Sequence, residues 1–239
     1  MLSRNEVKDI QSLCQKKHRQ EEGLFIAEGV KILDEVLKSD HVIRKVYALA
    51  SVCSTLPANI HAQEVTEAEL ERISLLETPN KVLAVIEQKK NNTPLVLKGK
   101  LSLVLDGIQD PGNLGTIIRI ADWFGIKDLI CSEDTVELYN PKVIQSTMGS
   151  FVRVDTHYLH LEEFLEKAAV PVFGATLDGE NIHQIKKPSE GLLMIGNESK
   201  GIRKELMKYI TQPITIPRIG GAESLNAGVA AGIILSHLT

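Results

Sequence analysis

Hydrophobic and polar positions in the first ninety residues follow helical and extended periods in turn. Apolar side chains at helical spacing predict three helices, over residues 6–14, 28–37 and 66–76. Thr66 precedes Glu69 by three residues, which is typical of a capping box at a helix start. Two β-branched runs predict strands, over residues 42–50 and 82–88. This part of the chain is therefore expected to form a small α/β domain.

From residue 101 onward, short apolar runs alternate with helical segments. The runs are continuously hydrophobic, as burial beneath helices on both faces of a parallel sheet requires. They predict strands at residues 101–105, 128–131, 170–175, 192–195 and 214–216. An alanine-rich helix is predicted over residues 227–238. We expect a Rossmann-like parallel α/β domain that binds ligands at the carboxyl ends of its strands.

A polar, lysine-rich segment that contains a proline separates the two parts, at residues 88–100. Such composition is typical of a linker. We therefore predict a first domain over residues 1–90, a linker over 91–100 and a second domain over 101–239.

The composition is that of a globular protein, and its charge is unevenly distributed along the chain. Of the 239 residues 43% are hydrophobic and 24% charged, which is ordinary for a globular protein. The formal net charge of -4 gives no global argument for nucleic acid. Residues 1–20, however, carry five basic against two acidic side chains, and residues 87–100 carry four basic against one acidic.

Cys14, Cys53 and Cys131 lie too far apart for a metal-ligand pair. Without a signal segment or a membrane-length apolar run, a soluble cytoplasmic protein that holds no metal is expected.

Three segments share one design, in which an apolar strand leads through a polar, glycine-containing turn into a helix. In the first, Gly107 and Gly112 have the separation found in a phosphate-binding loop. Asn113 and Leu114 stand where that loop needs lysine and a hydroxyl residue, so this interpretation fails. The three-glycine dinucleotide pattern is also missing, which argues against a nicotinamide or flavin enzyme.

The polar residues of the first two segments have specific expected positions. Asn113 is expected to cap the helix that follows it, and Arg119 to project from that helix away from the core. The structural alternatives are that Asn113 only caps the helix and that Arg119 forms an ion pair with Asp122 or with a neighbour. In the second segment, Gly196 ends a buried strand and lets a ligand approach the backbone. Glu198 follows in the turn, and its alternative role is to favour the positive end of the next helix.

The third segment lies before the alanine-rich helix. Gly220 and Gly221 give the loop freedom, and Ser224 and Asn226 offer short hydrogen-bonding side chains. The small residues of the helix predict close packing against another subunit or against the sheet.

These three segments resemble the motifs of the SPOUT superfamily, and within it the SpoU or TrmH-type RNA ribose 2'-O-methyltransferases. The matching residues, in order, are 106–119, 195–201 and 216–226. Residues 25–30 and 73–79 are similar to the substrate-binding domain that often precedes the motifs. The resemblance therefore covers nearly the whole chain.

The resemblance implies S-adenosylmethionine as cofactor, RNA as partner, a homodimer and a trefoil knot at the C-terminal end of the parallel-sheet domain. Cofactor contacts are implied for the backbone around Thr176, Leu177, Gly196, Ile216 and Leu225. A reaction site is implied that is lined by Asn113, Arg119, Glu198, Ser224 and Asn226.

The implied reaction is methylation of a ribose 2'-hydroxyl, most of all in large-subunit (23S) ribosomal RNA, because family members with the extra domain usually modify that RNA. Arg119 would hold a phosphate or polarise the hydroxyl, and Glu198 would accept or relay its proton. A tRNA ribose methyltransferase, a base methyltransferase and a non-catalytic RNA-binding or ribosome-assembly factor are the alternatives.

Overall fold

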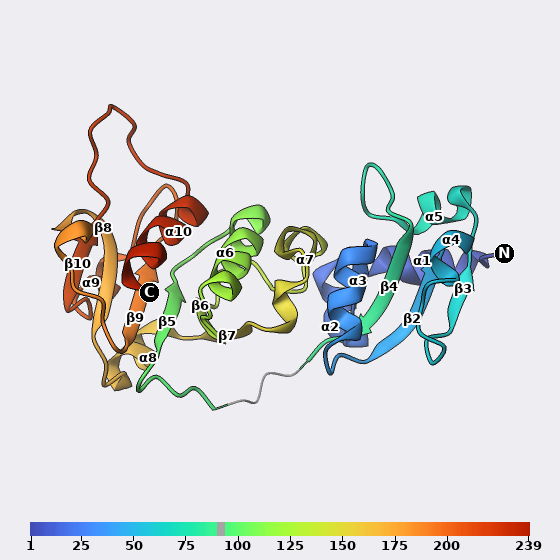
Figure 1. The fold of residues 1–239 in the computed structure, drawn as a ribbon, viewed down its shortest axis with the longest axis horizontal. Coiled ribbons are helices and arrows are strands. Elements are labelled where there is room, and N and C mark those ends of the chain that lie inside the picture. Colours follow the sequence, from blue (N-terminus) through green and yellow to red (C-terminus); the bar gives the residue numbers. More distant parts are fainter. Residues whose placement is uncertain (90–93) are drawn as a thin grey trace. The chain divides into compact units, whose positions relative to one another are not determined.

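The computed structural model describes residues 1–89 and 94–239 (Figure 1). The chain divides into two compact units, one made of Met1–Lys90 with Glu137–Val152, the other of Asn91–Val136 with Arg153–Thr239. The predicted linker, and the basic cluster that overlaps it, lie partly outside the described residues. Because the segment Glu137–Val152 belongs to the first unit, it interrupts the range 101–239 that the sequence assigns to one domain.

The first unit is built on a mixed four-stranded sheet in the order β1-β4-β2-β3. Strand β4 is antiparallel to both β1 and β2, and β2 is parallel to β3. Its elements are α1 (Arg4–Ser12), α2 (Lys16–Glu22), β1 (Leu24–Glu28), α3 (Val30–Leu37), β2 (Ile43–Ala48), α4 (Ala50–Cys53), β3 (Ala62–Glu64), α5 (Glu67–Ile73), β4 (Val82–Glu87), α7 (Pro141–Thr147) and η1 (Ser150–Val152). The predicted helices, the two predicted strands and the capping box of Thr66 are confirmed. Strands β1 and β3 were not predicted.

Buried polar and aromatic contacts hold the segment Glu137–Val152 within this unit. The Arg19 side chain, 2% exposed, forms an ion pair with Glu137 and donates to two backbone carbonyls of the preceding turn. The ring of Phe25 lies 4.6 Å from that of Tyr139 and 5.7 Å from that of Phe151, between ring centres. A buried ion pair and the contacts among three aromatic rings, one of them carried by β1, therefore stabilise this segment.

The two segments that resemble a substrate-binding domain meet at a buried carboxylate. Glu28, at the end of β1, is 4% exposed and accepts hydrogen bonds from the Ser74 hydroxyl at 2.5 Å and the Leu75 amide at 2.9 Å. Burial raises the pKa of the Glu28 carboxyl above its usual 4.5. Gly29 follows with φ 104°, a conformation that favours glycine and that separates β1 from α3.

The second unit is built on a six-stranded sheet in the order β10-β8-β9-β5-β6-β7. All neighbouring strands are parallel, which confirms the predicted parallel sheet. Its elements are β5 (Leu101–Leu105), α6 (Pro111–Trp123), β6 (Asp128–Ser132), β7 (Asp155–Leu159), α8 (Leu161–Lys167), β8 (Val172–Asn181), η2 (Ile182–Gln184), β9 (Gly191–Ile195), α9 (Lys204–Met207), β10 (Gln212–Thr215) and α10 (Ala227–Leu238). Strand β7 lies at the sheet edge and was not predicted, because it carries charged and polar side chains.

Small residues bring α10 against α6. A Cβ placed on Gly228 would lie 2.9 Å from the Thr116 side chain, and one on Gly232 would lie 3.5 Å from Ile120. Gly228 and Gly232 therefore face a helix of their own unit, whereas packing of α10 against a second subunit stays a prediction. Among the described residues, no helix is both long enough and apolar enough to cross a membrane.

Candidate active site

Side chains from all three predicted segments meet at Asn113. Its amide nitrogen Nδ2 donates to Glu198 Oε1 at 2.6 Å, and its oxygen Oδ1 accepts from Asn226 Nδ2 at 2.7 Å. These partners lie 85 and 113 residues away along the chain. One carboxamide therefore joins the three segments, and its donor end holds a carboxylate.

Asn113 is not the helix cap that the sequence predicts. Asp110 caps α6 and accepts from the Asn113 amide at 2.9 Å, with Pro111 as the first helical residue. Proline favours that first position, and aspartate is as good a cap as asparagine. Because Asp110 satisfies the helix end, the Asn113 side chain is available to Glu198.

Glu198 lies in a closed turn, residues 197–201, which we call the acidic turn. Asn197 and Gly201 exchange two backbone hydrogen bonds, of 3.1 and 2.8 Å, and the Asn197 side chain donates to the Gly107 carbonyl at 2.7 Å. Helix α9 starts only after this turn, so a role for Glu198 at the positive end of that helix is wrong. A Cβ on Gly196 would lie 2.2 Å from the carbonyl carbon of Gly201, so the chain's own backbone requires glycine there.

Residues 216–226, which we call the glycine loop, lead from β10 to α10. Figure 1 shows this loop extending well beyond the end of β10 before the chain returns to α10. Asn226 caps α10 by accepting from the amides of Gly228 and Val229, while its nitrogen contacts Asn113. Ser224 is exposed, and in this described part of the chain it makes no hydrogen bond, so it is not brought into the Asn113 cluster.

Arg119 lies on α6, roughly 9 Å along the helix axis from Asn113. Its side chain is exposed and, within the described residues, has no ion pair. The alternative partner Asp122 instead pairs with Arg153 at 2.8 Å. The structure therefore leaves an exposed guanidinium on the helix that carries Asn113, available to a phosphate or another anion.

The predicted cofactor contacts on β8 lie at a break in its pairing with β10. The register jumps so that residues 175–179 have no partner in the described strand β10. Thr176 and Leu177 fall in this stretch. The Thr215 hydroxyl donates to the Leu177 carbonyl at 3.1 Å, which brings Leu177 beside the start of the glycine loop at Ile216.

This region has the features of a site for a ligand with both polar and apolar surface. The Thr176 hydroxyl is buried and has no hydrogen-bond partner among the described residues. The Leu177 side chain is 70% exposed and Leu225, at the end of the glycine loop, is 46% exposed. Ligand sites commonly combine such apolar side chains with a few convergent polar groups.

An ion pair that no sequence motif indicates joins the end of β5 to the segment after the acidic turn. Asp106, 1% exposed, accepts from the Arg203 amide at 2.7 Å and from its Nε at 2.5 Å. Arg203 also contacts Asp134 at 3.3 Å. The hydrogen bond to Asp106 raises the pKa of Arg203. The two residues are 97 positions apart and no local pattern connects them.

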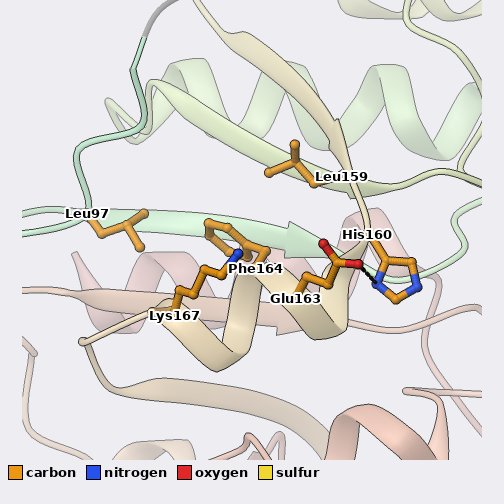
Figure 2. A pocket seen from close by; sticks show the side chains of 7 residues that line it. Leu97, Leu159, His160, Glu163, Phe164 and Lys167 are labelled. Atoms are coloured by element: carbon orange, nitrogen blue, oxygen red, sulfur yellow. Dashed lines mark ion pairs between the residues drawn. The ribbon is translucent and has the colours of Figure 1, made fainter.

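A separate surface hollow in the second unit, of about 310 Å³, does not coincide with this site (Figure 2). Its lining consists of Leu97, Leu159, His160, Glu163, Phe164, Lys167 and Ala168. None of these is a predicted site residue. Across the described residues, no group of three or more histidine, cysteine, aspartate or glutamate side chains is arranged to hold a metal ion.

Comparisons with known proteins match two parts of the chain to family models. The SpoU rRNA methylase family matches residues 100–236, and the MRM3-like substrate binding domain matches residues 4–84. The chain is 30% identical over 238 residues to the 23S rRNA (guanosine(2553)-2'-O)-methyltransferase RlmP of Bacillus subtilis, covering 97% of this chain and 95% of that protein. It is 29% identical over 226 residues to the 23S rRNA (guanosine-2'-O-)-methyltransferase RlmB of Neisseria meningitidis, covering 90% and 85%.

A solved structure, the AdoMet-bound rRNA methyltransferase from Sinorhizobium meliloti, is 32% identical to the chain, with a TM-score of 0.87. The similarity covers 100% of this chain and 95% of that one. Together with the family match over more than half of the chain, these similarities identify the protein's family. The chain belongs to the SpoU rRNA methylase family.

Proposed function

We propose that this protein transfers a methyl group from S-adenosylmethionine to the 2'-hydroxyl of a ribose in large-subunit ribosomal RNA. The observation that carries the proposal is the Asn113 side chain, which joins Glu198 and Asn226 at the meeting point of the three segments. The choice of RNA rests on RlmP and RlmB, whose names give 23S rRNA 2'-O-methylation. Ribosomal RNA as substrate places the reaction in the cytoplasm.

The residues around the break in β8 suit the cofactor. S-adenosylmethionine supplies a methyl group that is already activated by the positive charge on its sulfur. The unpartnered Thr176 hydroxyl offers a hydrogen bond, and the exposed Leu177 and Leu225 offer apolar surface to an adenine ring. We assign the cofactor contacts to the backbone around Thr176, Leu177, Gly196, Ile216 and Leu225.

The same segments are proposed to form the trefoil knot. A Cβ on Gly179 would lie 2.4 Å from the Ile214 amide nitrogen, so β10 passes β8 at closer range than any side chain permits. This close passage shows how tightly the two strands pack at the register shift, and the knot itself is proposed from the resemblance of the three segments.

The site residues have separate roles in this proposal. The exposed Arg119 guanidinium holds an RNA phosphate or polarises the attacking hydroxyl, since arginine keeps its charge. Glu198, oriented by Asn113, accepts or relays the hydroxyl proton. Ser224 and Asn226 fix the ribose, so that positioning supplies much of the rate.

A homodimer is proposed from an exposed apolar face on α6 and α10. Trp123 is 85% exposed, Val229 50% and Ile233 37%, although all three are large hydrophobic side chains. A second copy of the chain would cover this face. Sedimentation of the wild-type chain should give a dimer and that of Val229→Asp a monomer, whereas a wild-type monomer would contradict the proposal.

The activity is tested with the full chain, methyl-labelled S-adenosylmethionine, and separate transcripts of large-subunit ribosomal RNA and tRNA. Digestion to nucleosides and mass spectrometry should find the label on ribose in the large-subunit RNA. Label on tRNA would favour the tRNA alternative, and label on a base would refute ribose methylation. If titration calorimetry detects no heat of binding for S-adenosylmethionine, a non-catalytic RNA-binding factor is favoured.

The role of Arg119 has its own test. Arg119→Ala should greatly slow single-turnover methylation at saturating RNA, because the hydroxyl loses its positively charged neighbour. Full single-turnover activity in this variant would contradict the assigned role.

A further inference from the structure

We propose that Asp106 and Arg203 are positioning residues that hold the acidic turn, and with it Glu198, at the correct distance from Asn113. The inference rests on the proposed methyl transfer, because it concerns how the geometry of that site is set. In the described part of the chain, Asp106 and Arg203 hydrogen-bond to neither Glu198 nor Asn113. They therefore act through the backbone of the turn and not on the reacting atoms.

The acidic turn is attached to the end of β5 at two points. At its start, the Asn197 side chain donates to the Gly107 carbonyl at 2.7 Å. Two residues beyond its end, Arg203 binds Asp106 through both its backbone amide and its side chain. Glu198 lies between these two attachments, so its position depends on both of them.

The attachment at Arg203 is the more rigid of the two. One residue satisfies both oxygens of the Asp106 carboxylate, because Oδ2 accepts the Arg203 amide at 2.7 Å and Oδ1 accepts Nε at 2.5 Å. Asp106 is 1% exposed, so water does not compete for these bonds. Asp134 contacts the outer nitrogen of the same guanidinium and limits its rotation. Charge-assisted bonds in this planar geometry fix direction as well as distance.

Loss of this attachment should slow the reaction without weakening substrate binding. An error of about 1 Å in catalytic geometry costs on the order of 100-fold in rate. The predicted cofactor contact at Gly196 precedes the turn, and the Asp106 amide holds the neighbouring Ile195 carbonyl at 2.9 Å through the backbone alone. That backbone bond stays when the side chains of Asp106 and Arg203 are changed.

The experiment compares Arg203→Ala, Arg203→Lys and Asp106→Asn with the matched control Lys208→Ala. Lys208 follows α9 directly and pairs with Glu162 at 3.1 Å, away from the acidic turn. Arg203→Ala should lower kcat by about 100-fold, with the KM for RNA and the calorimetric affinity for S-adenosylmethionine unchanged. Arg203→Lys should recover part of kcat, because its charge can still reach one carboxylate oxygen.

Guanidinium ion at millimolar concentration should partly restore kcat in Arg203→Ala, because the Arg203 side chain is 41% exposed and its place is accessible. If the kcat of Arg203→Ala equals that of Lys208→Ala, the proposal is overturned. It is also overturned if kcat falls while the KM for RNA rises and the affinity for S-adenosylmethionine falls in parallel. If Arg203→Ala does not fold, Arg203→Lys and Asp106→Asn decide by the same measurements.

A second readout does not depend on activity. The amides of Ser199 and Lys200 bond to the Asn197 side chain within the turn at 3.0 and 3.2 Å. Their hydrogen exchange should be faster in Arg203→Lys than in Lys208→Ala. Equal exchange would refute the positioning role, whereas a wild-type chain that methylates no RNA would refute only the proposed function.

Discussion

The substitution Gly196→Ala provides a sharp test of how the acidic turn is packed. The added Cβ would lie 2.2 Å from the carbonyl carbon of Gly201 and 2.3 Å from the amide nitrogen of Ile202. Both are backbone atoms, so no side-chain rotation relieves the clash. Since ordinary contacts start at 3.4 Å, the turn must retreat by about 1 Å.

The consequences for stability and activity can be worked from that displacement. Overpacking of this kind costs about 1–3 kcal/mol in the free energy of unfolding, and each kcal/mol lowers the melting temperature of a domain this size by about 2–4 °C. Because Glu198 moves with the turn, kcat should fall on the order of 100-fold. The loss of activity should therefore be present at temperatures where the variant is still fully folded.

The assay measures single-turnover methylation well below the melting temperature, together with thermal unfolding by circular dichroism. The matched control is Gly221→Ala, because a Cβ on Gly221 meets nothing within 4 Å. The control should keep wild-type stability. Full activity and an unchanged melting temperature in Gly196→Ala would refute the packing argument.

Three further predictions concern single side chains. Asn113→Ala removes two side-chain hydrogen bonds, and the one to the Glu198 carboxylate is worth about 1.5–3 kcal/mol. Steady-state kcat/KM should therefore fall about 10–100-fold. An unchanged kcat/KM would contradict the role of this residue. Because burial raises the pKa of Glu28 above 4.5, the native state holds its proton longer than the unfolded state, and the unfolding free energy should fall as pH rises from 4.5 through the raised pKa. Urea unfolding at several pH values should show this decline, and Glu28→Gln should remove it. Arg19→Ala should lower the unfolding free energy by about 3 kcal/mol because its ion pair is buried. Arg44→Ala, which removes an exposed ion pair, should change the unfolding free energy by at most about 1 kcal/mol. Equal effects of the two variants in urea titrations would show that burial is not decisive.

Local patterns predicted much of the second unit correctly. The alanine-rich helix occupies the predicted residues 227–238, and the apolar runs form a parallel sheet. Periodicity succeeds here because burial on one or both faces determines which positions are apolar. Strand β7 was not predicted, because its two buried positions carry the polar residues Thr156 and His157 and so lack that apolar signal.

Within the candidate site, the error at the helix cap is local, whereas the omissions depend on contacts between distant residues. Asp110 and Asn113 are equally good caps, and Pro111 at the first helical position decides between them. Nothing near Asp106 indicates that Arg203, 97 residues later, will bind it. The resemblance identified the three segments, but only the folded chain shows that Asn113 connects the other two.

The segment Glu137–Val152 has a consequence for the engineering of chimeras. The match of residues 4–84 to a substrate binding domain suggests that specificity could be changed by exchanging residues 1–90 between relatives. Here such a chimera would separate Glu137 from its buried partner Arg19, and would remove Phe25 from the rings of Tyr139 and Phe151. A working exchange needs three matched junctions, at 90/91, 136/137 and 152/153. Residues 1–90 therefore form one structural unit with a segment that lies inside the SpoU rRNA methylase match, and they are not an independent N-terminal module.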